Sequence, residues 1–484
     1  MLFILILCSS VILLAIFSNK FLDALGIPAL LFFMCLGMLF GTDGIFKISF
    51  ADFANTKDIA SLALGFIIFY GGFCTKWTTA KPIIAKAAVL STAGVFLTAV
   101  LTSVFCHFVL ELSFLESFLI GAVISSTDAA SVFSILKAKN LHLKENTAPL
   151  LEIESGSNDP MSYVLVILAI TLMQNQSSGF VIALFFKQMI FGILIGVLVA
   201  KISIYIYEKT SIITDENGSL FIIALVLLSY LLPFFCDGNP FLAVYFLGII
   251  LGNANILNKV PMMHFFDGIT KLAQIGIFFT LGLLAFPREA PSILLTGMLI
   301  FLFLTFIARP AAVFLLLSFF KSGINQCLLV SWAGLRGVAS IVFAIIAMDS
   351  GITLHYDLFH LVFLISILSV AIQGTFLPLA AKMTNMIDPQ VDIKKTFNDY
   401  EEECAVKLLR ITVPENHDWV GKQIRCVEFP QKSLAILIKR KQERIIPKNS
   451  TVIQAGDNIT LSLPAINLPD ELLSLIHISE PTRH

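Results

Sequence analysis

About 13 apolar runs, each long enough to cross a lipid bilayer, follow one another along most of this 484-residue chain. A membrane-spanning helix needs about 20 apolar residues, because it rises about 1.5 Å per residue across a hydrocarbon core about 30 Å thick. The chain is 57% hydrophobic and only 13% charged. We therefore expect an all-α polytopic membrane protein. The expected spans are residues 2–18, 26–42, 59–75, 84–108, 115–136, 147–172, 180–207, 218–236, 240–257, 268–286, 292–319, 324–348 and 355–383.

The distribution of lysine and arginine predicts how these spans are oriented. No basic region precedes the first apolar run, so we expect a membrane helix there and not a cleaved signal peptide. If the N-terminus lies outside, about 13 basic residues fall on the cytoplasmic side and about 4 on the other, as the positive-inside rule requires. An odd number of spans then places the polar C-terminal region in the cytoplasm, and we expect a bacterial inner membrane protein. The net charge of −1 excludes nucleic acid as an obvious partner.

Acidic residues inside two neighbouring spans are the main functional signal. Asp128 follows three hydroxyl residues in the fifth span, and the sixth span carries Glu154, Ser155, Asn158 and Asp159. A carboxylate within a bilayer is costly and is retained where it faces a partner or an aqueous path. The four residues of the sixth span form two i, i+4 pairs, so they share one helix face. Such a set of hard oxygen ligands suits an alkali cation better than a soft metal.

The hydroxyl residues before Asp128 have two interpretations. Ser125, Ser126 and Thr127 can mark an interrupted helix whose freed carbonyl groups coordinate a cation. Alternatively, the hydroxyl groups bond back to the preceding helical turn and Asp128 caps a helix. We expect the first of these, because the second leaves the burial of the carboxylate unexplained.

Two arginines lie in later spans. Arg336 stands between two glycines in the twelfth span, and Arg309 precedes a proline in the eleventh. A buried arginine needs a carboxylate partner, and we expect Glu154 to pair with Arg336. Arg309 is a possible further site residue, or it snorkels to the membrane interface. If the spans form two halves of six around a seventh, the fifth and twelfth correspond, which indicates inverted repeats with interrupted helices.

The chemistry of the chain changes after residue 384. Residues 1–384 form the expected transmembrane domain, and residues 385–403 are polar and read as a linker. A small α+β cytoplasmic domain is expected at 404–464, since short β-type runs alternate there with turn signals. Residues 465–484 form a tail, of which the last ten or so resemble a translated sequencing adapter and not native protein. The expected strands are Ala405–Val413, Ser433–Lys439, Arg444–Ile446 and Asn458–Leu463.

Three motifs in this order resemble the cation:proton antiporter superfamily, in particular its bacterial NhaP-type branch. The motifs are Ser126-Thr127-Asp128, Glu154-Ser155-Gly156-Ser157-Asn158-Asp159-Pro160 and Gly334-Leu335-Arg336-Gly337.

The resemblance implies a homodimer of 13-helix protomers in which Asp128 and Asp159 bind cation or proton in competition. It also implies that Thr127 and Ser155 supply further oxygens, and that Asn158 supports a pair between Glu154 and Arg336. An Asn-Asp pair is typical of the electroneutral members.

The segment from Cys404 to Pro464 resembles a regulatory TrkA-C domain, which favours the potassium/proton subgroup. We therefore expect a secondary active antiporter that exchanges K⁺, ahead of Na⁺, for H⁺ in cation and pH homeostasis. It is not expected to be an enzyme or to need a cofactor.

The alternatives are a Na⁺/H⁺ antiporter of the same fold, a cation channel, and an intramembrane aspartyl protease. A channel is disfavoured because the chain has no filter-like segment. A protease is disfavoured because the chain has no GxGD pattern. The C-terminal domain either binds a small regulatory ligand or serves only as a dimerisation module.

Overall fold

The computed structural model describes residues 9–17, 29–48, 50, 53–139, 141–209, 217–254, 256, 259–388, 406–414, 418–427, 429, 434–440 and 443–464. The chain divides into two compact units, Met1–Phe397 and Asn398–His484. Most of the expected linker and all of the tail at 465–484 lie outside the described residues.

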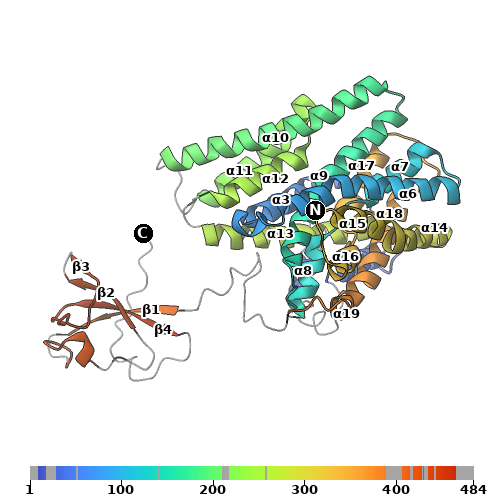
Figure 1. Ribbon diagram of the computed structural model, residues 1–484. Coiled ribbons are helices and arrows are strands. Elements are labelled where there is room, and N and C mark those ends of the chain that lie inside the picture. The colour runs from blue at the N-terminus through green and yellow to red at the C-terminus, as the bar shows by residue number, and fades with distance from the viewer. Residues whose placement is uncertain are drawn as a thin grey trace. The chain divides into compact units, whose positions relative to one another are not determined.

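Helices long and apolar enough to cross a membrane make up most of the first unit (Figure 1). The long spans are α3 (Phe53–Cys74), α5, η1 and α6 (Ile84–Val89, Leu90–Gly94, Val95–Val109), α9 (Thr147–Met173), α10 (Ser178–Lys209), α11 with η2 (Gly218–Leu231, Leu232–Cys236), α13 (Lys259–Leu284), α14, η4 and α15 (Ala290–Phe303, Leu304–Ala308, Arg309–Ser318), and α18, η5 and α19 (Leu358–Leu368, Ser369–Gly374, Thr375–Met383). The shorter helices are α2 (Ala29–Phe40), α7 (Phe114–Ile124), α8 (Ala129–Ala138), α12 (Pro240–Asn253), α16 (Ile324–Trp332) and α17 (Val338–Asp349), with α4 (Trp77–Ala80) and η3 (Pro287–Glu289) in connections.

Two helices begin earlier than their apolar runs predict. α13 starts at Lys259 and not near residue 268, and α3 starts at Phe53 and not near residue 59. The early part of α13 is amphipathic: Asp267 and Lys271 pair at 2.5 Å on one exposed side, while Met263 and Phe266 are buried. A hydropathy window reports only the mean hydropathy of its residues, so it misses a helical turn that is apolar on one side and polar on the other.

Two pairs of half-helices meet in the membrane region. α7 ends at Ile124 and α8 begins at Ala129, while α16 ends at Trp332 and α17 begins at Val338. The backbone N–H of Asp128 in the first break donates to the carbonyl of Leu335 in the second, at 2.8 Å. Irregular backbone at membrane depth is tolerated when protein satisfies its polar groups, and this hydrogen bond does so between the two breaks.

Glycines allow α12 to pack closely on α3. A Cβ atom at Gly72 would lie 2.7 Å from the Tyr245 carbonyl oxygen, and one at Gly248 would lie 2.3 Å from that of Phe69. Gly72 therefore lies at a close contact between the two helices, whereas a Cβ at the adjacent Gly71 would meet nothing within 4 Å. On its other side, α12 packs against α10, which runs alongside α11 and α12 in Figure 1.

The second unit is a four-stranded antiparallel sheet in the order β1-β4-β2-β3. Its elements are β1 (Val406–Thr412), η6 (Ile424–Cys426), β2 (Leu434–Arg440), β3 (Glu443–Ile445) and β4 (Asn458–Pro464). The four expected strands are thus confirmed to within a residue or so at each end. The small core centres on Ile438, Ile459 and Leu461, and beside it Arg440 binds the buried Asp457 carboxylate through Nε at 2.8 Å and Nη2 at 2.7 Å.

Candidate functional site

The polar face of α9 points into the helix bundle. Glu154 is 1% exposed, Ser155 5%, Asn158 0% and Asp159 9%. The prediction that these four residues share one buried face is confirmed. Pro160 lies within the same helix and cannot donate to the carbonyl four residues earlier, so the backbone ladder of α9 is weakened beside Asp159.

Asp128 caps α8. Its Oδ1 accepts hydrogen bonds from the backbone N–H groups of Ala130 at 2.9 Å and Ser131 at 3.3 Å, and its Oδ2 accepts from the Ser131 hydroxyl at 2.6 Å. The Ser125 hydroxyl bonds back to the carbonyl of Ala122 at 2.7 Å. Both features of the alternative interpretation, a helix cap and a back-bonded hydroxyl, are therefore present. They coexist with an interrupted helix, because Asp128 lies in the break itself.

Several hydrogen bonds join the α7–α8 break to α9, and three of them are short. The Ser126 hydroxyl donates to Oδ1 of Asp159, and Nδ2 of Asn158 donates to the Thr127 hydroxyl at 2.5 Å. The Ser155 hydroxyl donates to the carbonyl of Thr127 at 2.6 Å. The structure thus brings together Thr127, Asp128, Ser155 and Asp159, the four residues that the sequence predicts as ion ligands, with Asn158 beside them.

The buried ion pair of the site joins Glu154 to Arg309. Nη2 of Arg309 lies 2.9 Å from Oε2 of Glu154, and the two side chains are 3% and 1% exposed. The expected pair between Glu154 and Arg336 is therefore wrong, as is the alternative that Arg309 snorkels to the interface. Arg309 follows the π-helical turn η4, and the extra residue in such a turn changes which face the next residues present. Asn158 also donates to Glu154, at 3.4 Å.

Arg336 binds the end of a half-helix instead of a carboxylate. Its Nη1 donates to the carbonyl oxygens of Ser125 at 2.8 Å and Ser126 at 2.7 Å. The last carbonyl groups of a helix lack intrahelical partners and carry partial negative charge, so a guanidinium is a favourable partner for the C-terminus of α7. Arg336 thus binds two of the carbonyl groups that the helix break frees, those of Ser125 and Ser126.

Sequence reasoning missed the polar residues that support the second break. The backbone N–H of Arg336 donates to the hydroxyl of Ser369 at 3.0 Å, and that hydroxyl donates to Oε1 of Gln373 at 2.6 Å. Nε1 of Trp332 donates to the carbonyl of Gln373 at 3.0 Å. Both supporting residues lie on the π-helical turn η5. Their i, i+4 spacing in an apolar span was the signal that could have identified them.

The described site contains three carboxylates and two guanidinium groups. Asp128, Glu154 and Asp159 oppose Arg309 and Arg336, which leaves one net negative charge when all five groups are ionised. An uncompensated charge in a low-dielectric interior is costly. One monovalent cation or one proton would balance it, and either could occupy the oxygens of Asp128 and Asp159.

Comparisons with known proteins agree with this fold. The fold is that of a mostly helical, multi-span membrane protein, and it resembles the structure of the sodium proton antiporter MjNhaP1 from Methanocaldococcus jannaschii with a TM-score of 0.68. That match has 24% identity and covers 78% of this chain and 97% of the other. The family model for the sodium/hydrogen exchanger transmembrane region matches residues 9–382, and the TrkA-C domain model matches residues 408–465. The chain therefore belongs to the sodium/hydrogen exchanger family. It is a monovalent cation/proton antiporter and not an enzyme.

Two curated relatives cover most of the chain. A K⁺/H⁺ antiporter NhaP2 from Shewanella oneidensis is 31% identical over 440 residues, which are 90% of this chain and 76% of the relative. A K⁺/H⁺ antiporter NhaP from Alkalimonas amylolytica is 30% identical over 95% of this chain and 80% of its own length.

Proposed function

We propose that this protein exchanges K⁺ for H⁺ through alternating occupation of Asp128 and Asp159. Thr127 and Ser155 supply further oxygens to the cation, Arg309 neutralises Glu154, and Arg336 holds the end of α7. The observation that carries this proposal is the single net negative charge on five ionisable groups, of which all but the half-buried Asp128 are buried. Because a proton and a monovalent cation each carry one positive charge, the two would compete for the same site. An exchange of one for one would leave the charge of the loaded site unchanged.

The preference for K⁺ over Na⁺ rests on the relatives and on the second unit. The two curated relatives described above cover 90% and 95% of the chain, and each is described as a K⁺/H⁺ antiporter. The TrkA-C match extends the likeness beyond the membrane region. Na⁺ remains the alternative substrate, since the Na⁺/H⁺ antiporter 1 of M. jannaschii is 27% identical over 343 residues, which cover 67% of this chain.

The proposed architecture has 13 spans in two inverted repeats, with the α7–α8 and α16–α17 breaks as corresponding elements. The hydrogen bond between Asp128 and Leu335, which links the two breaks, supports this correspondence. We place residues 1–384 in the exchanger domain, 385–403 in a linker and 404–464 in a regulatory domain. The lysine and arginine bias supports an outside N-terminus and a cytoplasmic C-terminus in a bacterial inner membrane. A homodimer, and a small ligand for the C-terminal domain, complete the proposal.

Proteoliposomes test the exchange directly. Addition of K⁺ to vesicles that hold a pH gradient should dissipate the gradient faster than Na⁺ or Li⁺, and Asp159→Asn should abolish the effect. Asp267→Asn is the matched control, because Asp267 also lies on a membrane helix but pairs with Lys271 on α13, outside the site. Continued K⁺/H⁺ exchange by Asp159→Asn would overturn the mechanism. Faster dissipation of the pH gradient with Na⁺ than with K⁺ would reverse the proposed ion preference but would leave the exchange mechanism unchanged.

A further inference from the structure

The chain that leaves the last span pairs with the loop between α8 and α9. Residues 385–388 follow α19 and run antiparallel to that loop. The backbone N–H of Lys144 donates to the carbonyl of Met386 at 2.9 Å, and the N–H of Asp388 donates to the carbonyl of His142 at 2.9 Å. Residues 385–388 therefore form a strap that ties the end of α19 to the α8–α9 loop.

Side chains hold the strap in place. Met386 is 2% exposed and belongs to the apolar cluster that also contains Val132 of α8 and Leu335 of the second break. Ile387 lies opposite Leu143 in the antiparallel bridge, and both pack partly buried against the same cluster. The strap is thus held by a few local contacts, and a segment of this kind can open while the helices beside it stay folded.

The loop under the strap connects the two elements that carry the proposed ion ligands. α8 precedes the loop and is capped by Asp128, and α9 follows it and carries Asp159. Glu145 and Asn146 end the loop with φ angles of 58° and 53°, in the left-handed region that residues other than glycine seldom adopt. Residues in this region are held there by their surroundings. The loop therefore has a defined shape, and a displacement of it acts on both helices.

The same loop contacts the second break. Nε2 of Gln326 on α16 donates to the carbonyl of Glu145 at 3.1 Å and to the hydroxyl of Thr147 at 3.0 Å. Gln326 and Thr147 are at most 1% exposed. The α8–α9 loop is therefore linked to one half-helix of each break, and the strap links it to the end of the last span.

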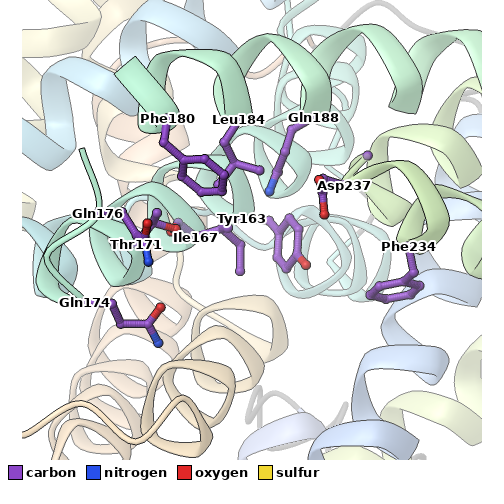
Figure 2. A pocket seen from close by; sticks show the side chains of 11 residues that line it. Tyr163, Ile167, Thr171, Gln174, Gln176, Phe180, Leu184, Gln188, Phe234 and Asp237 are labelled. Carbon is purple, nitrogen blue, oxygen red and sulfur yellow. The ribbon is translucent and has the colours of Figure 1, made fainter. Parts of the chain in front are cut away.

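α9 is restrained unequally at its two ends. Its C-terminal half lines a cavity of about 370 Å³ with Tyr163, Ile167 and Thr171 (Figure 2). Side chains that border a cavity have fewer packing contacts. Near its N-terminal end, Leu150 is buried in the cluster that holds Met386. The contacts at this end, the strap among them, therefore restrain α9 more than those at the other end.

We propose that the strap is a conformational restraint on the ion site and that the second unit releases it. The docked strap ties α8, α9 and α16 to the end of α19 and slows their rearrangement, and its release speeds exchange. The covalent path from β1 to the first unit reaches the strap before it reaches α19, so a pull from the second unit acts on the strap first. The inference rests on the proposed exchange at Asp128 and Asp159 and adds its regulation.

A reversible disulfide tests the restraint. Leu143 and Ile387 form an antiparallel pair without hydrogen bonds between them, in which the Cα atoms lie about 4.5 Å apart and can be bridged by a disulfide. In a variant without the eight native cysteines, oxidation of Leu143→Cys/Ile387→Cys should slow K⁺/H⁺ exchange in proteoliposomes several-fold, and a reductant should restore it. The single-cysteine variants under the same oxidant are the controls. Equal rates in the reduced protein and in protein whose disulfide is verified by mass spectrometry would overturn the restraint.

Release of the strap tests the opposite direction. Met386→Gln places a polar side chain in the apolar cluster and should undock the strap. The amides of Lys144 and Asp388 should then exchange hydrogen faster, and K⁺/H⁺ exchange should speed up several-fold. Met383→Gln is the matched control, because Met383 lies at the end of α19 and is 77% exposed. Faster amide exchange with unchanged or slower transport would overturn the restraint, and if Met386→Gln fails to fold, the disulfide result decides.

A combined variant tests the role of the second unit. Asp457→Asn removes the ion pair with Arg440 and should weaken the pull on the strap, so it should slow exchange by the reduced double-cysteine protein and leave the oxidised protein unchanged. The same response in both forms would show that the second unit does not act through the strap. The proposed function fails if Asp159→Asn still exchanges K⁺ for H⁺. The restraint fails on the ratio of oxidised to reduced rates in protein that retains Asp159, so the two failures are distinguishable.

Discussion

At the scale of single residues, the site depends on small residues as much as on charged ones. Gly334 and Gly337 flank Arg336 in the second break. A Cβ at Gly334 would lie 2.9 Å from Nε of Arg309, and one at Gly337 would lie 2.3 Å from Oδ2 of Asp128. These glycines therefore leave room for the ionised side chains of other helices.

Substitution of Gly337 tests this requirement. Gly337→Ala should abolish or greatly slow exchange and destabilise the protein by about 1–3 kcal/mol, because the new methyl group overlaps the Asp128 carboxylate. Gly276→Ala on α13 is the control: its Cβ would meet nothing within 4 Å, and alanine favours a helix interior by about 1 kcal/mol. Exchange rates in vesicles and thermal unfolding of the purified proteins measure both effects. Normal exchange by Gly337→Ala would contradict the tight contact.

At the scale of helices, each break is stabilised by groups that replace lost backbone hydrogen bonds. Arg336 binds the last carbonyls of α7, Asp128 binds the first N–H groups of α8, and Ser369 binds the N–H of Arg336. Asp128 can therefore have a structural role and the proposed transport role at the same time. Each carboxylate oxygen that accepts a capping hydrogen bond keeps a second lone pair for an ion.

Two substitutions separate these roles. Asn caps helices about as well as Asp, whereas Ala costs about 0.5–2 kcal/mol. Asp128→Asn should therefore lose exchange with little change in melting temperature, and Asp128→Ala should lose exchange and also melt earlier. Vesicle transport and thermal unfolding are the measurements. If Asp128→Asn still exchanged K⁺ for H⁺, the capping role would be the main one.

At the scale of the whole molecule, the second unit has its own buried polar anchor. Burial alone would raise the pKa of the Asp457 carboxyl, but hydrogen bonds from Arg440 and from the backbone N–H of Gln454 outweigh it and hold that pKa below its ordinary value. A lowered pKa means that ionised Asp457 stabilises the folded domain above the unfolded-state pKa of about 3.9. That stabilisation is lost as the pH falls through the folded-state pKa.

Hydrogen exchange of β4 in the full chain tests this anchor. At neutral pH, Asp457→Asn should exchange its β4 amides much faster than the wild type, because the ion pair with Arg440 is lost. The ratio of the two rates should approach one as the pH falls through the lowered folded-state pKa of Asp457. A comparison at equal pH cancels the intrinsic pH dependence of amide exchange. A ratio that stayed constant with pH would show that the charge of Asp457 does not stabilise the domain.

The sequence by itself determined most of the apolar helices of the first unit, the four strands of the second unit and the cluster of polar residues around Asp128 and Asp159. These follow from local patterns: the length of apolar runs, strand-type residues between turn signals, and the i, i+4 spacing that places Ser155 and Asp159 on one face.

Only the tertiary structure decided that Glu154 pairs with Arg309 and that Arg336 binds the carbonyl groups directly after α7. Both arginines lie in apolar spans, so the composition of the spans could not show which arginine pairs with Glu154. The choice depends on how separate helices are rotated and how deeply they pack, and a π-helical turn such as η4 changes that rotation without any clear mark in the sequence.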